Sequence, residues 1–171
     1  MIREAAEFAE RAHEGVYRKG TKIPYITHPM ETAAIVTAFT NEPEMIAAAL
    51  LHDVIEDAGV TKEELEEKFG SRVAFLVESE SEDKSRSWME RKGTTVEHLK
   101  SATRDEKILA LADKLSNIRS TVRDYLVLGD EVWQRFNQKD KEMQGWYYKG
   151  VAEALKELKG HIYYEEYLML C

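Results

Sequence analysis

The chain has 171 residues, of which 43% are hydrophobic and 33% charged, and its formal net charge at pH 7 is −8. This length suits a single domain with its own core, predicted to span residues 1–171. The negative charge argues against a nucleic-acid-binding protein, which needs a basic surface, although a metal ion or a local basic cluster can still bind an anionic substrate.

The chain also lacks the marks of a membrane or secreted protein. No apolar run reaches the length of a membrane span, and the start MIREAAEFAERAH is too polar for a signal peptide. The single cysteine, Cys171, excludes an intrachain disulfide. We therefore expect a cytoplasmic protein with no membrane and no nucleic-acid partner, and the sequence leaves homo-oligomerisation open.

Nearly every periodic stretch has helical spacing, starting with residues 1–14, where small and apolar side chains recur three and four apart. Residues 16–28 have no helical period and are predicted to form a loop, within which IPYIT is the one candidate strand. Helices are predicted over residues 1–14, 29–40, 43–58, 61–69, 71–79, 87–102, 104–128, 130–158 and 161–169. The fold class is all-α, a bundle of about eight to nine helices.

Within the predicted helix 43–58, the stretch LLHDVIEDAG places four ionisable side chains beside apolar ones. On a helical wheel, His52, Asp53, Glu56 and Asp57 form one stripe at the carboxyl end of an apolar helix. The helix dipole disfavours negative charge there, and burial of unpaired carboxylates costs more. A solvated polar face is the simple alternative, but the apolar surroundings favour a divalent-cation site.

Further ligands are available elsewhere in the chain. ITHP supplies His28 at a helix start, and LALADKLSNIRS supplies Asp113 in an apolar face, with Asn117 one turn later. Together with His52 and Asp53 they make a mixed nitrogen and oxygen set, which suits Mn²⁺, Fe²⁺ or Zn²⁺ and would not select Cu(I) or an iron–sulfur cluster.

The order His28, then His-Asp at 52–53, then Asp113 resembles the signature of the HD-domain metal-dependent phosphohydrolases. The resemblance extends to YRKGTKIPYITHP (17–29), LLHDVIEDAGVTKEELEEKFGSRVAFLV (50–77), EDKSRSWMERK (82–92), VEH (96–98) and ALADKLSNIRS (110–120). These segments, within residues 1–125, are similar to the hydrolase domain of the RelA/SpoT alarmone enzymes and to the small alarmone hydrolases.

The resemblance implies a role for each matching residue. The metal ligands would be His28, His52, Asp53 and Asp113, with Mn²⁺ the usual ion and Fe²⁺ or Zn²⁺ as alternatives, and Glu56 and Asp57 would position and activate the attacking water. Glu56, crowded by its acidic neighbours, should have a raised pKa and act as the base. Substrate-binding positions would be Arg18, Lys19, Lys84, Arg91, Lys92 and Asn117.

The implied reaction is hydrolysis of the 3′-pyrophosphate of guanosine tetra- or pentaphosphate, a small-molecule nucleotide, giving pyrophosphate and GDP or GTP. This chain departs from the family pattern at SESED (79–83), at Ala58 and at Gly93, which puts the substrate in question more than the metal. The alternatives are a phosphatase acting on another nucleotide or NADPH, and a non-catalytic metal-containing binding module.

Other candidate residues are predicted to be structural. Trp146 and Tyr147 are similar to an aromatic pair late in the family and are expected in the core. His13, His98 and His161 are expected to pack or to lie on the surface rather than bind a ligand.

Overall fold

The structure, a computed structural model, describes all 171 residues and confirms the all-α class. Ten α-helices and two short 3₁₀ helices follow one another along the chain. The only β-type contact is an isolated bridge between Tyr17 and Pro24, so the candidate strand in IPYIT does not form. None of the helices combines the length and apolar character that a transmembrane span requires.

The elements in chain order are α1 (Ile2–Ala12), α2 (Thr27–Val36), α3 (Pro43–Leu51), α4 (Val54–Ala58), α5 (Lys62–Phe69), α6 (Ser71–Glu80), α7 (Trp88–Ser101), α8 (Arg104–Leu128), η1 (Gly129–Arg135), α9 (Lys141–Ala154), η2 (Lys156–Leu158) and α10 (Ile162–Leu170).

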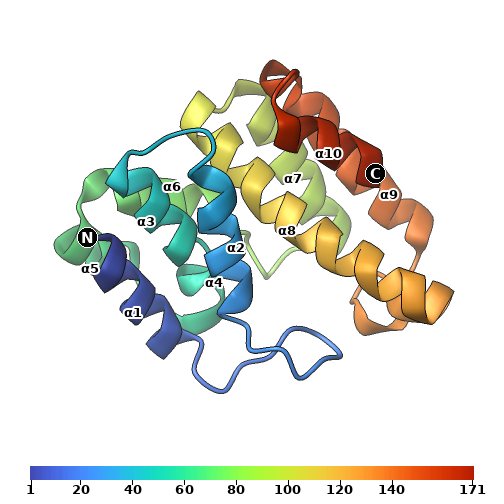
Figure 1. Cartoon of the computed structure of the whole chain (residues 1–171), viewed down its shortest axis with the longest axis horizontal. Coiled ribbons are helices and arrows are strands. Elements are labelled where there is room, and N and C mark those ends of the chain that lie inside the picture. The colour runs from blue at the N-terminus through green and yellow to red at the C-terminus, as the bar shows by residue number, and fades with distance from the viewer.

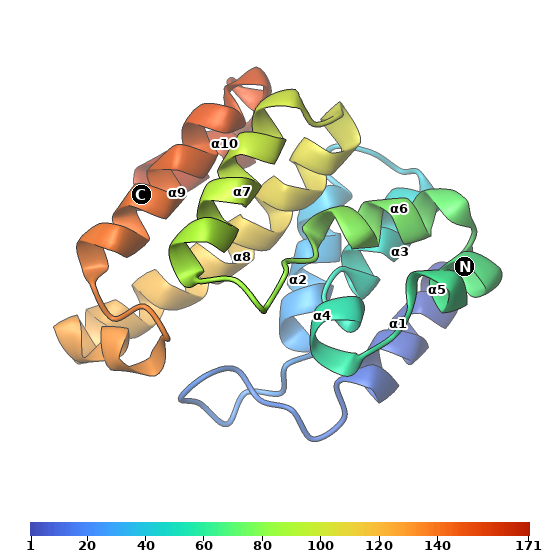
Figure 2. The ribbon, with the colours of Figure 1, turned by 180° about the vertical axis from the view of Figure 1, so that it is seen from behind.

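Helix α8 forms the axis of the bundle (Figure 1). It packs against α2, α3 and α6 on one side and against α10 and η1 on the other. Helices α1 to α6 gather on one side of it, and α7, α9 and α10 gather on the opposite side, with α7 packed against α9 (Figure 2). The amino and carboxyl termini lie on these opposite sides.

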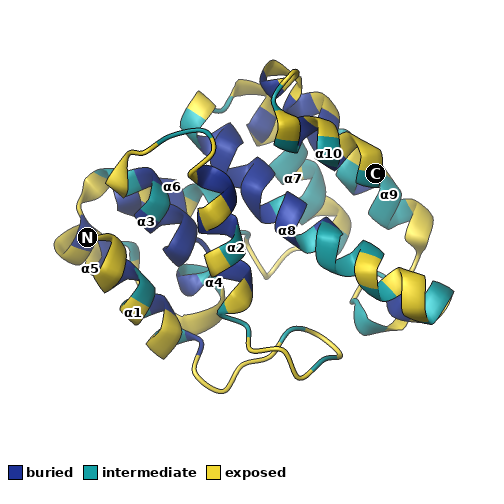
Figure 3. Ribbon diagram, in the orientation of Figure 1, coloured by how far each residue is buried: buried dark blue, intermediate teal, exposed yellow.

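One hydrophobic cluster of 34 buried residues forms the core. Figure 3 shows that burial concentrates on α2, α3 and the first half of α8, where they meet. Helical spacing within residues 104–128 predicts one buried apolar face that runs from Ile108 to Leu126. This face is buried from Ile108 to Ile118, but Leu126 is 81% exposed because the end of the helix projects beyond the neighbouring helices. The predicted buried role of Leu126 is therefore wrong.

The predicted helix 43–58 is divided in two at His52 and Asp53. The His52 ring atom Nδ1 lies 2.8 Å from the carbonyl oxygen of Ala49. A side-chain donor at this carbonyl competes with the backbone N–H that continues the helix, which explains the break. Helix α4 then carries Glu56 and Asp57 and ends at Gly59, whose φ of 69° is left-handed. The four polar residues therefore do not share one uninterrupted helix.

The predicted helix 130–158 is also interrupted. Residues 129–135 form η1, and the regular helix α9 begins only after Asp140, whose side chain accepts a hydrogen bond from the backbone N–H of Glu142. Asp140 thus caps the amino terminus of a new helix. Residues 136–138, between η1 and α9, form part of the wall of a cavity.

Candidate functional site

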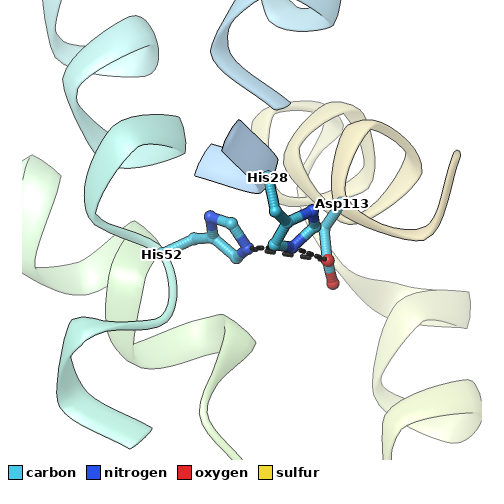
Figure 4. A group of neighbouring side chains, drawn as sticks. All are labelled: His28, His52 and Asp113. Atoms are coloured by element: carbon cyan, nitrogen blue, oxygen red, sulfur yellow. Dashed lines mark hydrogen bonds and ion pairs between the residues drawn. The ribbon is translucent and has the colours of Figure 1, made fainter. Parts of the chain in front are cut away.

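Three buried side chains from distant segments meet at the centre of the bundle (Figure 4). His28 comes from the first turn of α2, His52 from the break between α3 and α4, and Asp113 from the middle of α8. The His28 Nε2 atom lies 3.1 Å from His52 Nε2 and 3.0 Å from Asp113 Oδ1, and His52 Nε2 lies 3.5 Å from the same oxygen. Three ligand atoms of suitable chemistry therefore point at one place.

Asp53, the fourth predicted ligand, reaches the same place from the helix break. Its Oδ2 atom lies 3.0 Å from His52 Nε2 and 3.5 Å from His28 Nε2. The Tyr25 hydroxyl donates a hydrogen bond of 2.6 Å to this oxygen and orients the carboxylate. Tyr25 stands in the loop before α2, and its role was not predicted from the sequence.

The spacing of these atoms fits a divalent ion. Ligand atoms bound at about 2.1 Å and at right angles to one another lie about 3.0 Å apart. The ring nitrogens and carboxylate oxygens here are 3.0 to 3.5 Å from one another across the pairs given above. The donor set of two imidazoles and two carboxylates suits Mn²⁺, Fe²⁺ or Zn²⁺.

Hydrogen bonds hold the Asp113 carboxylate in place from two further sides. Asn117 Nδ2 donates to Oδ1 at 2.7 Å, and the Lys114 ammonium pairs with Oδ2. Lys114 also pairs with the buried Glu80 carboxylate at 3.0 Å. Neither Lys114 nor Glu80 was predicted; Lys114 adjoins Asp113 in sequence, but its partner lies 34 positions away.

Ionisation within the cluster follows from this crowding. Burial opposes ionisation of Asp53, but the adjoining His52 holds the pKa of its carboxyl below the ordinary value. Burial also opposes the charged form of His52, but Asp53 and Asp113 raise the pKa of this imidazole above its ordinary value. Burial lowers the pKa of His28. Positive charge at this point therefore stabilises the carboxylates, and a metal ion can supply it in place of a proton.

A cavity of about 590 Å³ opens beside the cluster and is reached by Asp53 and Asp113. Seven basic and seven acidic side chains are among its lining residues, in a chain with a formal net charge of −8. The cavity is therefore close to neutral, and a divalent ion would make it cationic and suited to a multiply charged anion.

Glu56 and Asp57 line this cavity from α4. Lys84 donates to the Glu56 carbonyl oxygen at 2.8 Å and to Asp57 Oδ1 at 3.1 Å. Burial raises the pKa of Glu56, Lys84 opposes this rise, and the acidic neighbours reinforce it. The raised pKa was predicted, but burial rather than crowding is its main cause.

Arg91 and Lys92 also reach the cavity, but they are held by an acidic partner that was not predicted. Arg91 Nη1 lies 3.0 Å from Glu82 Oε2, and Lys92 Nζ lies 2.8 Å from Glu82 Oε1. Glu82 belongs to the SESED stretch in which the chain departs from the family pattern. It neutralises much of the charge that these two residues would offer to an anion.

Arg18 and Lys19 are the two basic residues of the lining that form no ion pair with a carboxylate. Arg18 Nη2 donates to Asn117 Oδ1 at 2.8 Å, and the Arg18 Cζ atom lies over the Tyr25 ring, 5.6 Å from its centroid. The chain Arg18–Asn117–Asp113 therefore connects the cavity mouth to the predicted metal ligands.

A further part of the cavity lining comes from residues that the sequence did not single out. They come from the end of α8, from η1, from the segment between η1 and α9, and from α9 itself, and they are Asp124, Val132, Arg135, Phe136, Asn137, Gln138, Gln144 and Tyr148. Arg135 pairs with Asp124 at 2.8 Å and packs so closely on Gly20 that a Cβ there would clash with the Arg135 side chain. Gly20, with a φ of 70°, thus lets the 16–28 loop approach η1.

The remaining histidines and aromatic residues have packing roles. His13 is buried against the Tyr25 ring at 4.7 Å, and His161 caps α10 and stacks on Phe39. Tyr147 is buried as predicted and forms part of the cavity wall. Trp146 is 41% exposed, so its predicted place in the core is wrong, because its side of α9 faces solvent.

Comparison with known families gives one match, described as an HD domain, over residues 5–140. Relatives named guanosine-3′,5′-bis(diphosphate) 3′-pyrophosphohydrolase MESH1 are similar to most of the chain. The one from Xenopus tropicalis is 37% identical over 163 residues, and the human one is 36% identical over the same length. Each alignment covers 94% of this chain and 86% of the relative.

A bacterial relative of the same enzyme name, from Haemophilus influenzae, is 39% identical over 118 residues, which are 66% of this chain but only 17% of that protein. Two solved structures share the fold. A Listeria monocytogenes protein superposes with a TM-score of 0.77 at 33% identity, covering 84% of this chain and 95% of the other. A structure described as a metazoan orthologue of SpoT that hydrolyses ppGpp superposes with a TM-score of 0.82 at 27% identity, covering 98% and 91%.

Proposed function

This chain belongs to the HD-domain family, and from that membership we propose that it is a metal-dependent hydrolase that removes the 3′-pyrophosphate of guanosine tetraphosphate and pentaphosphate. One observation carries the proposal: relatives with this activity in their name match 94% of the chain at 36–37% identity. Water adds to the 3′-terminal pyrophosphate ester, and the products are pyrophosphate with GDP or GTP. We propose that the protein acts in the cytoplasm on a free nucleotide.

In the proposed mechanism, His28, His52, Asp53 and Asp113 would hold one divalent ion, for which we propose Mn²⁺. When bound, such an ion lowers the pKa of a coordinated water from about 15.7 towards 7 and neutralises charge on phosphate oxygens. Asn117 and Lys114 hold the Asp113 carboxylate, and Tyr25 holds that of Asp53, so the ligands are oriented before the ion arrives.

Glu56 is the proposed general base. It lines the cavity on the segment that follows Asp53, and its raised pKa makes it a better proton acceptor near neutral pH than an exposed glutamate. Asp57, held by Lys84, positions the attacking water beside it. Lys84 in addition fixes α4 through the Glu56 carbonyl oxygen.

Arg18 and Lys19 are the proposed first partners of the substrate phosphates, because they carry positive charge that no carboxylate neutralises. Arg91 and Lys92 bind phosphate in competition with Glu82 and contribute less. The Asn117 amide, which bridges Arg18 and Asp113, lies where the nucleoside meets the reacting phosphate in this proposal.

The test is to incubate the Mn²⁺-loaded protein with guanosine tetraphosphate, NADPH and simple nucleoside phosphates and to identify the products. Pyrophosphate released from the tetraphosphate alone is the expected result. Release of orthophosphate from NADPH or another nucleotide would instead show that the substrate is a different phosphate ester. No turnover of any of them with Mn²⁺, Fe²⁺ or Zn²⁺ would identify a binding module. The variant E56Q is the matched control for contaminating phosphatases.

A further inference from the structure

The two predicted histidine ligands differ in how their second ring nitrogen is held. His52 Nδ1 lies 2.8 Å from the Ala49 carbonyl oxygen, an atom that only accepts hydrogen bonds. His28 Nδ1 instead lies 2.8 Å from the hydroxyl oxygen of Ser116, which can donate or accept. The backbone therefore determines the tautomer of His52, whereas side chains determine that of His28.

The Ser116 hydroxyl has a second partner that decides its direction. Glu31 Oε2 lies 2.8 Å from Ser116 Oγ, and an ionised carboxylate only accepts. The single hydroxyl proton of Ser116 is then used on Glu31, and its oxygen must accept from His28 Nδ1. With the proton on Nδ1, the Nε2 atom that faces Asp113 and His52 carries a lone pair.

Glu31 is itself held by the carboxyl-terminal part of the chain. Arg119 Nη1 donates to Glu31 Oε1 at 2.9 Å, and the Nε and Nη2 atoms of Arg119 both donate to Glu166 at 2.6 Å. Glu166 belongs to α10, so this helix supports a carboxylate two hydrogen bonds away from His28. Glu31 is not among the residues that line the cavity.

We infer that Glu31 is a positioning residue of the metal site, which acts through the Ser116 hydroxyl to keep the His28 proton on Nδ1 and Nε2 open to an ion. This inference rests on the assignment of His28 as a ligand in the proposed function. Outer partners of metal-bound histidines are typically worth 10–100-fold in metal affinity. Since Glu31 does not reach the cavity, its effect on the substrate is indirect.

The chain offers a closely matched control in Glu44. Both carboxylates accept from an arginine Nη1 at 2.9 Å, and their side chains are 39% and 38% exposed. The partner of Glu44, Arg72, also pairs with Glu42 and Asp105, away from the metal ligands. Loss of an arginine ion pair is therefore common to E31Q and E44Q, and only E31Q disturbs the path to His28.

The experiment measures Mn²⁺ binding to the ion-free protein without substrate, from the EPR signal of the free ion. We expect E31Q to weaken Mn²⁺ binding about 10–100-fold and E44Q to leave it unchanged, while both shift the melting temperature of the ion-free protein alike. A Gln amide at position 31 can donate to Ser116 and turn its hydroxyl towards His28, which opposes the required tautomer.

The double variant decides whether the effect passes through Ser116. In the S116A background, E31Q should weaken Mn²⁺ binding no further, because the connection is already broken. If E31Q reduced Mn²⁺ affinity equally with and without Ser116, Glu31 would act only by attracting the cation through its charge, and the inference would be overturned. In the Zn²⁺-loaded protein, the His28 Nδ1–H resonance should exchange with water faster in E31Q than in E44Q; equal rates would also overturn it.

These readouts are independent of the reaction. If guanosine tetraphosphate is not hydrolysed, the Mn²⁺ affinities still test the inference. If E31Q binds Mn²⁺ as tightly as the unchanged protein, the inference fails while the proposed hydrolase activity stands.

Discussion

Replacing Glu56 by Gln tests the proposed base with little change in shape. Gln cannot take a proton from water, so turnover should fall by the 10²–10⁴-fold that general base catalysis typically provides, about 3 to 5 kcal/mol of activation free energy. The environment of Glu56 favours the upper part of this range. Its side chain is 22% exposed, and burial raises its pKa towards the working pH, where a base is most effective.

The same substitution should lower turnover without lowering the stability of the fold. A carboxyl whose pKa is raised in the folded protein destabilises the fold once pH exceeds its unfolded value, because the charged form is disfavoured. E56Q removes that cost, so the melting temperature at neutral pH should stay the same or rise. In the unchanged protein, turnover should be lost as pH falls through the raised pKa, above the ordinary glutamate value of 4.5.

The assay is pyrophosphate release from guanosine tetraphosphate by Mn²⁺-loaded protein across a pH series, with Mn²⁺ affinity measured alongside. Retained Mn²⁺ affinity with lost turnover supports a role in water activation. Normal turnover by E56Q would refute the assignment of the base, and lost Mn²⁺ affinity would move Glu56 into the ligand set.

Three further predictions concern residues around the base. The variant D53A should lose Mn²⁺ binding in the EPR titration, and unchanged affinity would remove Asp53 from the ligand set. The variant K84M should move the acidic limb of the pH profile to higher pH, because Lys84 opposes the rise in the pKa of Glu56; a limb moved to lower pH would contradict this. The variant K114M should lower the free energy of unfolding by about 3–5 kcal/mol in urea denaturation, because the carboxylates of Glu80 and Asp113 lose their buried cation. A smaller loss in K114M would indicate that these carboxylates take up protons instead.

The parts of the site that were predictable are those in which one short segment carries the signal. His52, Asp53, Glu56 and Asp57 fall within six residues, so their composition against an apolar background was visible in the sequence. His28 and Asp113 are remote from them: each was a candidate ligand in its own segment, and the ordered motifs of the resemblance joined them to His52 and Asp53, since helical periodicity alone does not say which faces meet.

Residues that act across the bundle were not predictable in this way. Glu80 belongs to the polar SESED stretch (79–83), in which no sequence pattern indicates burial, yet it is buried against Lys114, which lies 34 positions further on. The break before α9 contains neither glycine nor proline, and its one signal was the capping residue Asp140. The break within 43–58 depends on the contact of the His52 ring with the carbonyl oxygen of Ala49, which no pattern of hydrophobicity predicts.

The last part of the chain builds part of the wall of the cavity beside the proposed metal ligands, and it therefore bears on the substrate of the proposed function. The family match ends at residue 140, but Gln144, Tyr147 and Tyr148 of α9 follow it and line the cavity. The proposed metal ligands, by contrast, all lie within the matched residues. The proposed ion chemistry can therefore be combined with different outer walls, and in the proposed function the fit of the nucleotide also depends on side chains beyond the family match. Helix α10 adds no lining residue, yet through Glu166 and Arg119 it holds the carboxylate that faces Ser116. The carboxyl-terminal helices thus connect to the site in two ways: α9 lines the cavity, and α10 is connected to His28 by hydrogen bonds through Arg119, Glu31 and Ser116.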